Sequence, residues 1–462
     1  MSVSDFSFST AQALQQAIDD AYQQTLQSLK ELVAIPSVAW ESFDLSEVER
    51  SARKVQQLAL AAGFESAQVL SVPYGDEGKM GMPALLAHKP AEAGYPTFLL
   101  YAHHDVQPAG DLQEWKTPPF EATLVGDRLF GRGAADDKAG LMAHLAAFSA
   151  VRQVLGSDFR AGVTLFIEGE EEAGSPSFDA FVTRYQKELA ADYIIVADSA
   201  NWKAGLPALT SSLRGVASGD IRVRVSEHSV HSGMFGGPLL DAPTVLVRLL
   251  ASLHDSQGSV AVEGLISGPE PEVEYLEEDF RQDAAVLDGV ELAGRGSIAS
   301  RLWNQPAISL IGMDISPVDQ SSNTLRAECR ARISLRLAPG QDPAQAHQLL
   351  AQHVSQQAPW GAEVSYQPVD SGKPYQADLS GPGAQLALAA LEKAWGKKPV
   401  TTGMGGSIPF IATLSDLYPE AQILITGIED PDTRAHSANE SLYLPDFKRA
   451  ILAEALMLAE VS

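Results

Sequence analysis

The sequence of 462 residues is poor in cysteine and in basic side chains. Its single cysteine, Cys329, cannot form an internal disulfide, which is typical of proteins from a reducing compartment. Only 33 Lys and Arg stand against 59 Asp and Glu, which gives a formal net charge of -26. Because nucleic-acid phosphates and anionic membranes are bound by clustered basic residues, this balance argues against both as partners.

Long apolar runs and a leader-like start are also missing. The longest apolar runs, such as 161–167 and 421–428, are far shorter than the roughly 20 residues of a membrane-spanning helix. The N-terminus has neither the basic start nor the apolar centre of a signal peptide. With 45% hydrophobic residues the chain can still build a core, and its length indicates more than one domain. We therefore expect a folded cytoplasmic protein that does not bind membranes.

Hydrophobic periodicity predicts helices at the N-terminus, followed by alternating strands and helices. Helical spacing runs from about Thr10 to Val33, a second helix over 46–62 ends at Gly63, and a third covers 139–155. Four apolar runs are typical of buried parallel strands: 96–103, 162–169, 192–198 and 422–428. This pattern predicts an α/β fold with a mixed, mostly parallel sheet flanked by helices. Ligands of such sheets usually bind beyond the carboxyl ends of the strands.

The middle of the chain follows a different pattern. Segments 218–227 and 330–339 alternate polar and apolar residues, as strands with one solvated face do. Between them lie an apolar helix, 241–253, and an acidic stretch, 270–283, which we interpret as solvated surface. We therefore predict an α+β domain inserted into the first. The predicted divisions are 1–213 and 372–462 for the main domain and 214–371 for the insertion.

The first candidate site residues follow the strand over 96–103. Alternate residues of an extended segment share a face, so His103 and Asp105 point together while His104 points away. A carboxylate beside a metal-binding imidazole fixes the tautomer of the ring. A purely structural pair at a strand end is the alternative.

Further carboxylates follow other predicted strands or glycine-rich turns. Asp136 and Asp137 come after the Gly-rich segment 131–133; the alternative for them is capping of a helix N-terminus. The three glutamates 170–172 directly follow a buried strand, where a divalent cation would offset their repulsion; a solvated turn is the alternative. Asp198 ends another strand.

Together with His436, which lies in a loop, these side chains provide ligands for two neighbouring metal ions. Imidazole and carboxylate without thiolate suit zinc, and manganese or cobalt is also compatible. One further glutamate would be free to act as a base toward a metal-bound water.

Five motifs in order resemble one family of hydrolases. They are YAHHDVQP at 101–108, GRGAADDK at 131–138, EGEEEAGS at 168–175, HSGMFGG at 231–237 and GGSIP at 405–409. The chain resembles the co-catalytic zinc metallopeptidases of the carboxypeptidase G, aminoacylase and carnosinase type, and within them the carnosinase-like cytosolic non-specific dipeptidases. The similarity runs from about Leu32 to Phe447. It implies a zinc-exopeptidase-like catalytic domain with an inserted lid domain. The same lid domain would join two chains into a homodimer.

The resemblance implies hydrolysis of a peptide bond in small peptides, most often dipeptides, by a water shared between two zinc ions. The implied metal ligands are His103, Asp136, Glu172, Asp198 and His436. Asp136 would bridge the two ions and be followed by a cis peptide bond to Asp137. Asp105 would orient His103, and Glu171 would be the general base that later delivers its proton to the leaving amine.

The resemblance also assigns substrate contacts. The implied residues are His231, Asn323, Arg336, Gly406 and Ser407. His231 would polarise the scissile carbonyl, often in the site of the partner subunit, and Arg336 would bind the substrate carboxylate. The alternative is an ordinary loop histidine for His231 and a solvated strand face for Arg336. For Gly406 and Ser407 it is simple turn chemistry.

Two other functions are compatible with parts of this pattern. A deacylase of N-acyl amino acids, of the acetylornithine or succinyl-diaminopimelate type, would use the same metal centre, so only the substrate pocket would differ. A catalytically silent peptide-binding scaffold would have lost a ligand or the base, and this sequence has lost none.

Overall fold

The chain divides into two compact units in the computed structural model, which describes residues 8–406 and 408–461. The first unit comprises Met1–Ser211, Ala377–Thr402 and Thr413–Ser462, and the second comprises Ser212–Gln376 and Gly403–Ala412. The sequence predicts that 403–412 belong to the main domain, whereas they group here with the second unit. Among the described helices, none combines the length and apolarity needed to cross a bilayer.

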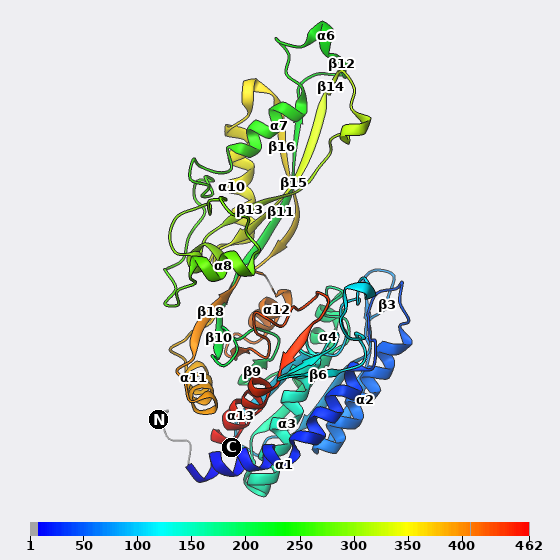
Figure 1. The fold of residues 1–462 in the computed structure, drawn as a ribbon, viewed down its shortest axis with the longest axis vertical. Coiled ribbons are helices and arrows are strands. Elements are labelled where there is room, and N and C mark those ends of the chain that lie inside the picture. Colours follow the sequence, from blue (N-terminus) through cyan, green and yellow to red (C-terminus); the bar gives the residue numbers. More distant parts are fainter. Residues whose placement is uncertain (1–7, 407, 462) are drawn as a thin grey trace. The chain divides into compact units, whose positions relative to one another are not determined.

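The first unit is built on a sheet with the strand order β1–β4–β8–β5–β9–β19–β10 (Figure 1). The strands are β1 (Ser66–Leu70), β4 (Ala84–Lys89), β5 (Thr97–His103), β8 (Gly162–Glu168), β9 (Tyr193–Val196), β10 (Ala208–Leu213) and β19 (Gln422–Thr426). β5 pairs in parallel with both β8 and β9, and β19 pairs in parallel with β9. The four buried parallel strands predicted from apolar runs are thereby confirmed.

Helices cover this sheet because its central strands are apolar on both faces. On β5, Phe98 and Leu100 join the core that includes helix α3, while Tyr101 packs edge-on against Phe166 with ring centroids 5.6 Å apart. The helices of this unit include α1 (Phe8–Val33), α2 (Ser46–Ala62), α3 (Lys138–Leu155), α4 (Phe178–Arg184), α11 (Pro382–Trp395) and α13 (Leu444–Glu460). The α/β class predicted from the sequence is confirmed.

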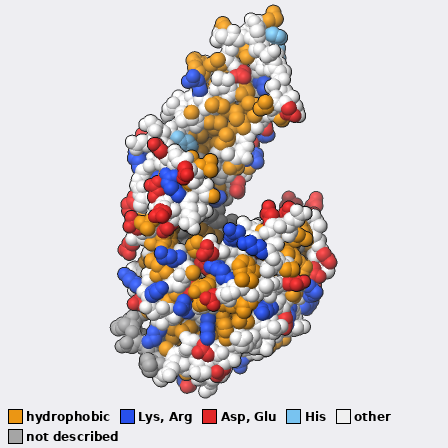
Figure 2. Space-filling view, in the orientation of Figure 1, with side chains coloured by type: hydrophobic (Ala, Val, Ile, Leu, Met, Phe, Trp, Pro, Cys, Tyr) orange, Lys and Arg blue, Asp and Glu red, His pale blue; other side chains and the backbone are white. Residues whose placement is uncertain are grey.

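The helices predicted at the N-terminus also form. α2 ends at Gly63, whose φ of 103° places it in the left-handed region that glycine adopts without strain, and its N–H caps the last turn. On the face shown in Figure 2, acidic and basic side chains are interspersed over this unit, so the net charge of -26 does not mark one docking surface there.

The second unit contains an antiparallel sheet in the order β13–β15–β11–β16. Its elements are β11 (Gly215–Arg224), β13 (Ala307–Met313), β15 (Glu328–Leu337), β16 (Glu363–Gly372), α7 (Ala242–Ala251), α8 (Glu277–Asp283) and α10 (Pro343–Gln356). Ile221 and Ile333 belong to the core that α7 and α10 cover, while Arg222 and Arg332 are exposed, as the alternating pattern predicts. The second half of the acidic stretch forms the exposed helix α8.

Candidate metal centre

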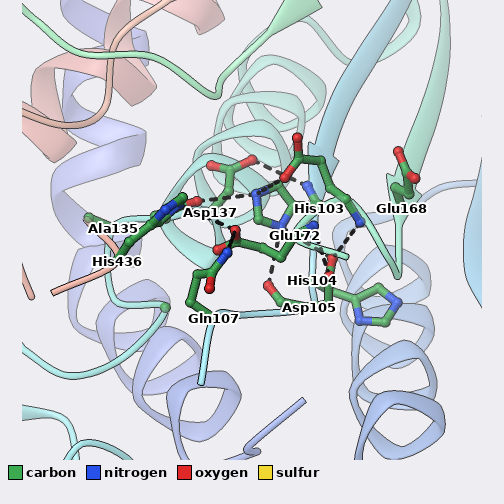
Figure 3. A network of polar contacts seen from close by, with 12 residues as sticks. His103, His104, Asp105, Gln107, Ala135, Asp137, Glu168, Glu172 and His436 are labelled. Carbon is green, nitrogen blue, oxygen red and sulfur yellow. Dashed lines mark hydrogen bonds and ion pairs between the residues drawn. The ribbon is translucent and has the colours of Figure 1, made fainter. Parts of the chain in front are cut away.

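The candidate ligands lie where the parallel strands of the first unit end. β5 ends at His103 and β8 at Glu168, while Asp198 follows β9 by two residues. Because these strands run in parallel, their carboxyl ends meet at one edge of the sheet. Two groups of side chains gather there, each with ligand atoms within 4.8 Å of one another: His103, Asp137 and Asp198, and Asp136, Glu172 and His436. Figure 3 shows His103, Asp137, Glu172 and His436 turned toward a common centre.

Asp136 lies between two histidines. Its Oδ1 is 3.2 Å from Nε2 of His103, and its Oδ2 is 3.0 Å from Nε2 of His436. The same nitrogen of His436 is 3.2 Å from Oε2 of Glu172. A carboxylate that directs its two oxygens at two different histidines is placed as a bridging ligand needs to be. The peptide bond between Asp136 and Asp137 is cis, as the resemblance implies.

Asp137 occupies the N-cap position of α3, but its side chain caps no helix amide. Its Oδ2 instead accepts a hydrogen bond from the backbone N–H of His103 at 3.2 Å. Burial and the nearby Asp198 raise the pKa of Asp137 well above its usual range. The capping alternative is therefore wrong for this side chain, and Asp137 joins the candidate ligands.

His103 has the orientation of a metal-binding imidazole. Its Nδ1 is 3.1 Å from the backbone oxygen of Asp105 and 3.4 Å from the Asp105 carboxylate. Donation from Nδ1–H leaves a lone pair on Nε2, which is buried and makes no hydrogen bond among the described residues. This nitrogen, which lies 3.2 Å from the Asp136 carboxylate without forming a hydrogen bond, fits a metal ligand. His104 points away, as predicted, and its Nε2 lies 2.8 Å from the oxygen of Pro83 (Figure 3).

The three successive glutamates have different surroundings. Glu170 is buried and accepts hydrogen bonds from the backbone N–H groups of Met82 and Ser177, at 2.9 and 2.8 Å. The Glu172 side chain is only 3% exposed, whereas that of Glu171 is 24% exposed. The solvated-turn alternative is therefore wrong for Glu170, and of the three side chains that of Glu171 is the most exposed.

The loop that carries these glutamates is held by Asp105. The backbone N–H groups of Glu171 and Glu172 donate to the two different oxygens of the Asp105 carboxylate, both at 3.1 Å. Glu172 also accepts a hydrogen bond of 2.7 Å from Gln107, and Oε2 of Glu171 lies 3.9 Å from Nε2 of His103. These contacts suit Glu172 to bind a metal ion. They leave Glu171 in a position to act as a base next to that ion.

The centre holds more negative charge than its own histidines neutralise. Burial and the neighbouring Asp136 raise the pKa of Glu172 to about 8, and burial raises the pKa of Asp198 to about 6. Burial also raises the pKa of Glu171 well above its usual range. Divalent cations would offset this charge and keep the carboxylates ionised, and the nitrogen and oxygen donors present fit such ions.

Sequence patterns did not point to Glu440, which holds the backbone of Asp136. Its Oε1 accepts hydrogen bonds from the N–H groups of Ala135 and Asp136, at 3.0 and 3.2 Å. Its Oε2 accepts from the N–H of Gly133 at 3.1 Å and from Arg132 at 2.6 Å. Glu440 stands four positions after His436, and that proximity is its one signal in the sequence.

His436 itself adopts a left-handed backbone conformation, with φ at 63°. This region disfavours residues other than glycine, and proteins retain such strain mainly where a side chain must be aimed for function. The observation supports a functional role for His436, which the local sequence pattern alone does not indicate.

The predicted substrate residues that the structure describes belong to the second unit. His231 ends β12 (Val230–His231), which pairs with β14 (Thr324–Leu325), and the N–H of Ser232 donates to the oxygen of Asn323 at 2.9 Å. Arg336 lies near the end of β15, and Gly406 has open space where a Cβ would be. Ser407 lies outside the described residues.

Within this unit the predicted substrate residues form two groups. In Figure 1, β12, β14 and α6 (Ser232–Phe235) lie at one end of the unit, away from the end where β15 finishes near Arg336. His231 and Asn323 therefore lie together, but apart from Arg336.

Comparison with known proteins agrees with the resemblance. Residues 99–460 match the model of peptidase family M20/M25/M40. The chain is 34% identical to the cysteinylglycine-S-conjugate dipeptidase of Corynebacterium striatum over 368 residues, which are 79% of this chain and 80% of that protein.

Solved structures show the same fold. Human carnosine dipeptidase 1 superposes with a TM-score of 0.75 at 25% identity, and the dipeptidase Dug1p of Saccharomyces cerevisiae with 0.76 at 24% identity, each covering 98% of both chains. The family predicted from the five motifs is thereby confirmed: the chain belongs to peptidase family M20/M25/M40.

Proposed function

We propose that the chain hydrolyses the peptide bond of small peptides, dipeptides foremost, with two divalent metal ions, for which the donor set best suits zinc. The proposal rests on the position of Asp136, whose two carboxylate oxygens face His103 and His436. Glu171 lies beside His103. Relatives support dipeptides as the substrate class: one is the dipeptidase of C. striatum, and another, 28% identical over 92% of this chain, is the Beta-Ala-His dipeptidase of Mus musculus.

The residues that would hold the ions are His103, Asp136, Glu172, Asp198 and His436, with Asp137 as an additional candidate. Bound ions would supply Lewis-acid activation of water and of the scissile carbonyl. Glu171 would take the proton of the attacking water and return it to the leaving amine. Asp105 fixes the Glu171 backbone for this task, since its carboxylate accepts the Glu171 N–H at 3.1 Å.

Metal removal should abolish turnover of dipeptides. We expect the purified protein to cleave members of a dipeptide panel, to lose that activity after dialysis against a chelator, and to regain it with zinc, manganese or cobalt. Comparing the three ions at equal occupancy would identify the one that restores most activity. A preference for N-acyl amino acids in the same assay would favour the deacylase instead, and full activity of metal-depleted protein would overturn the proposal.

We further propose that the chain works as a homodimer formed through its second unit, with His231 acting in the site of the partner subunit. Two observations support this. His231 and Asn323 lie at the opposite end of the unit from Arg336, so one unit does not gather them around one substrate. Two large apolar side chains shortly after His231 are also exposed, Met234 at 75% and Phe235 at 51%. Contiguous exposed apolar side chains mark interaction sites, whereas scattered single ones are common on any surface.

Mixing two inactive variants tests this arrangement. His231→Ala and Glu171→Gln should each be inactive alone, whereas subunit exchange between them should restore part of the wild-type activity. In the mixed dimer one site would combine an intact Glu171 with an intact His231 from the other chain. Absence of restored activity after verified exchange, or a fully active monomer in light scattering, would contradict the proposal.

A further inference from the structure

The outer face of the sheet in the second unit carries a row of arginines that are paired with carboxylates. The pairs are Arg222–Glu328, Arg224–Glu363, Arg330–Asp314 and Arg332–Asp220. Two arginines at the end of this sheet depart from the pattern. Neither Arg214, which precedes β11, nor Arg336, near the end of β15, forms an ion pair with any carboxylate among the described residues.

Strand register brings these two arginines together. Arg336 pairs across the sheet with Val216, two residues after Arg214. Diagonal neighbours of this kind lie roughly 7–8 Å apart on an antiparallel sheet, within reach of two long side chains. Like charge at this spacing is unfavourable, and burial together with Arg336 lowers the pKa of Arg214 to about 10.

Arg214 is held in a fixed position by carbonyl groups. It is 8% exposed, and its Nε donates to the oxygen of Gly405 at 3.1 Å. Its Nη1 points at the oxygens of Arg301, in α9 (Ile298–Trp303), and of Gln305, at 3.4 and 3.5 Å. The second terminal nitrogen, Nη2, has no hydrogen-bond partner among the described residues.

Carbonyl groups orient a guanidinium but do not neutralise it. A buried charge without a counter-ion is costly, and a second cation nearby adds to the cost. An anion between Arg214 and Arg336 would remove both penalties, and the planar guanidinium with its free Nη2 suits a carboxylate. Gly406, next to the Gly405 carbonyl that holds Arg214, leaves open space on its Cβ side.

We propose that Arg214 and Arg336 together form a carboxylate-binding site, in which Arg214 is a specificity-determining residue for substrates with a free C-terminus. This assignment rests on the function proposed above. The resemblance implies that Arg336 alone binds the substrate carboxylate. The alternative is a structural role for Arg214 at the C-terminal end of α9, where a cation interacts favourably with the helix dipole. That role accounts for Nε and Nη1 but leaves Nη2 and the unpaired Arg336 unexplained.

Matched substrates with and without the charge test the proposal. Ala-Gly and Ala-Gly-amide differ in the C-terminal carboxylate, so KM and kcat are measured for both. Arg214→Gln should raise KM for Ala-Gly by roughly 10- to 100-fold, the range expected when a charged hydrogen bond is lost, and should leave KM for the amide nearly unchanged. Arg222→Gln, on the same sheet and exposed, is the matched control and should change neither value.

A binding measurement separates failure of this site from failure of the proposed function. In calorimetry, N-acetylglycine should bind to wild type and to the Arg222→Gln control with the same affinity. It should bind at least tenfold more weakly to Arg214→Gln. If dipeptides are not cleaved but this pattern holds, the proposed function fails and the site stands. If dipeptides are cleaved while Arg214→Gln changes both substrates equally or neither, the site is overturned.

A third variant covers the case in which Arg214→Gln does not fold. Arg214→Lys keeps the charge but loses the planar fork, so it should show an intermediate rise in KM for Ala-Gly. A lysine variant that binds N-acetylglycine and turns over Ala-Gly as wild type does would refute the specific role of the guanidinium.

Discussion

Replacing Glu171 with glutamine is expected to lower kcat by roughly 10²- to 10⁴-fold, the contribution typical of a general base. The amide has the size of the carboxylate, so the hydrogen bond from the Glu171 backbone to Asp105 and the surrounding packing are retained. Metal content should therefore stay at the wild-type level, and thermal unfolding should change little. Steady-state kinetics with a dipeptide and metal analysis of the same sample measure both quantities.

The neighbouring glutamate provides the matched control. Glu172→Gln removes a carboxylate that lies 3.2 Å from His436, so it should lower metal content and lose activity for that reason. Excess metal should partly restore activity to Glu172→Gln but not to Glu171→Gln. A Glu171→Gln protein that keeps full activity would refute the assigned base, and one that loses its metal would show that Glu171 is a ligand.

Glu440→Gln should reduce the free energy of unfolding of the metal-free protein by about 3–5 kcal/mol, the cost of leaving one partner of a buried ion pair uncompensated. Arg132 and Glu440 are 1% and 0% exposed, and they are joined at 2.6 Å. Chemical denaturation of the metal-free protein measures this loss without a contribution from bound ions.

The same substitution should weaken metal binding, by roughly 10- to 100-fold, because residues that support ligands contribute at this level. Glu440 accepts a hydrogen bond from the N–H of Asp136, so its charge helps to place this candidate bridging ligand. Glu49→Gln is the control: it breaks an exposed pair with Arg53 and should cost less than about 1 kcal/mol with no change in metal titration. Equal losses in the two variants would contradict the proposed role of Glu440.

Much of the fold and part of the site could be predicted because both depend on local patterns. Apolar runs marked the central parallel strands, and parallel strands deliver the residues that follow them to one edge. This is why the sequence alone is enough to group His103, the glutamates 170–172 and Asp198, although they are far apart along the chain. The choice of Glu172 among the glutamates came from the resemblance. His436 lies in a loop without such a pattern, so its residue type alone made it a candidate, and the resemblance to a family assigned it a role as a ligand.

The remaining site residues depend on contacts that no local pattern encodes. Glu440 accepts hydrogen bonds from backbone N–H groups more than 300 positions earlier in the chain. In the sequence, a single glutamate before a short strand is not distinctive. Arg214 stands out only because carboxylates pair with the other arginines of the sheet, which requires knowledge of strand register. Sequence patterns also left the role of Asp137 open, since capping and ligation both suit an aspartate before a helix.

Asp105 connects the two halves of the candidate metal centre through separate atoms. Its backbone oxygen orients His103 in one candidate group, and its carboxylate holds the loop that carries Glu172 in the other. A displacement of either half is thus transmitted to its counterpart through one residue. We therefore expect the energetic effects of substitutions at His103 and Glu172 to be non-additive, with the two candidate ligand groups behaving as one cooperative unit.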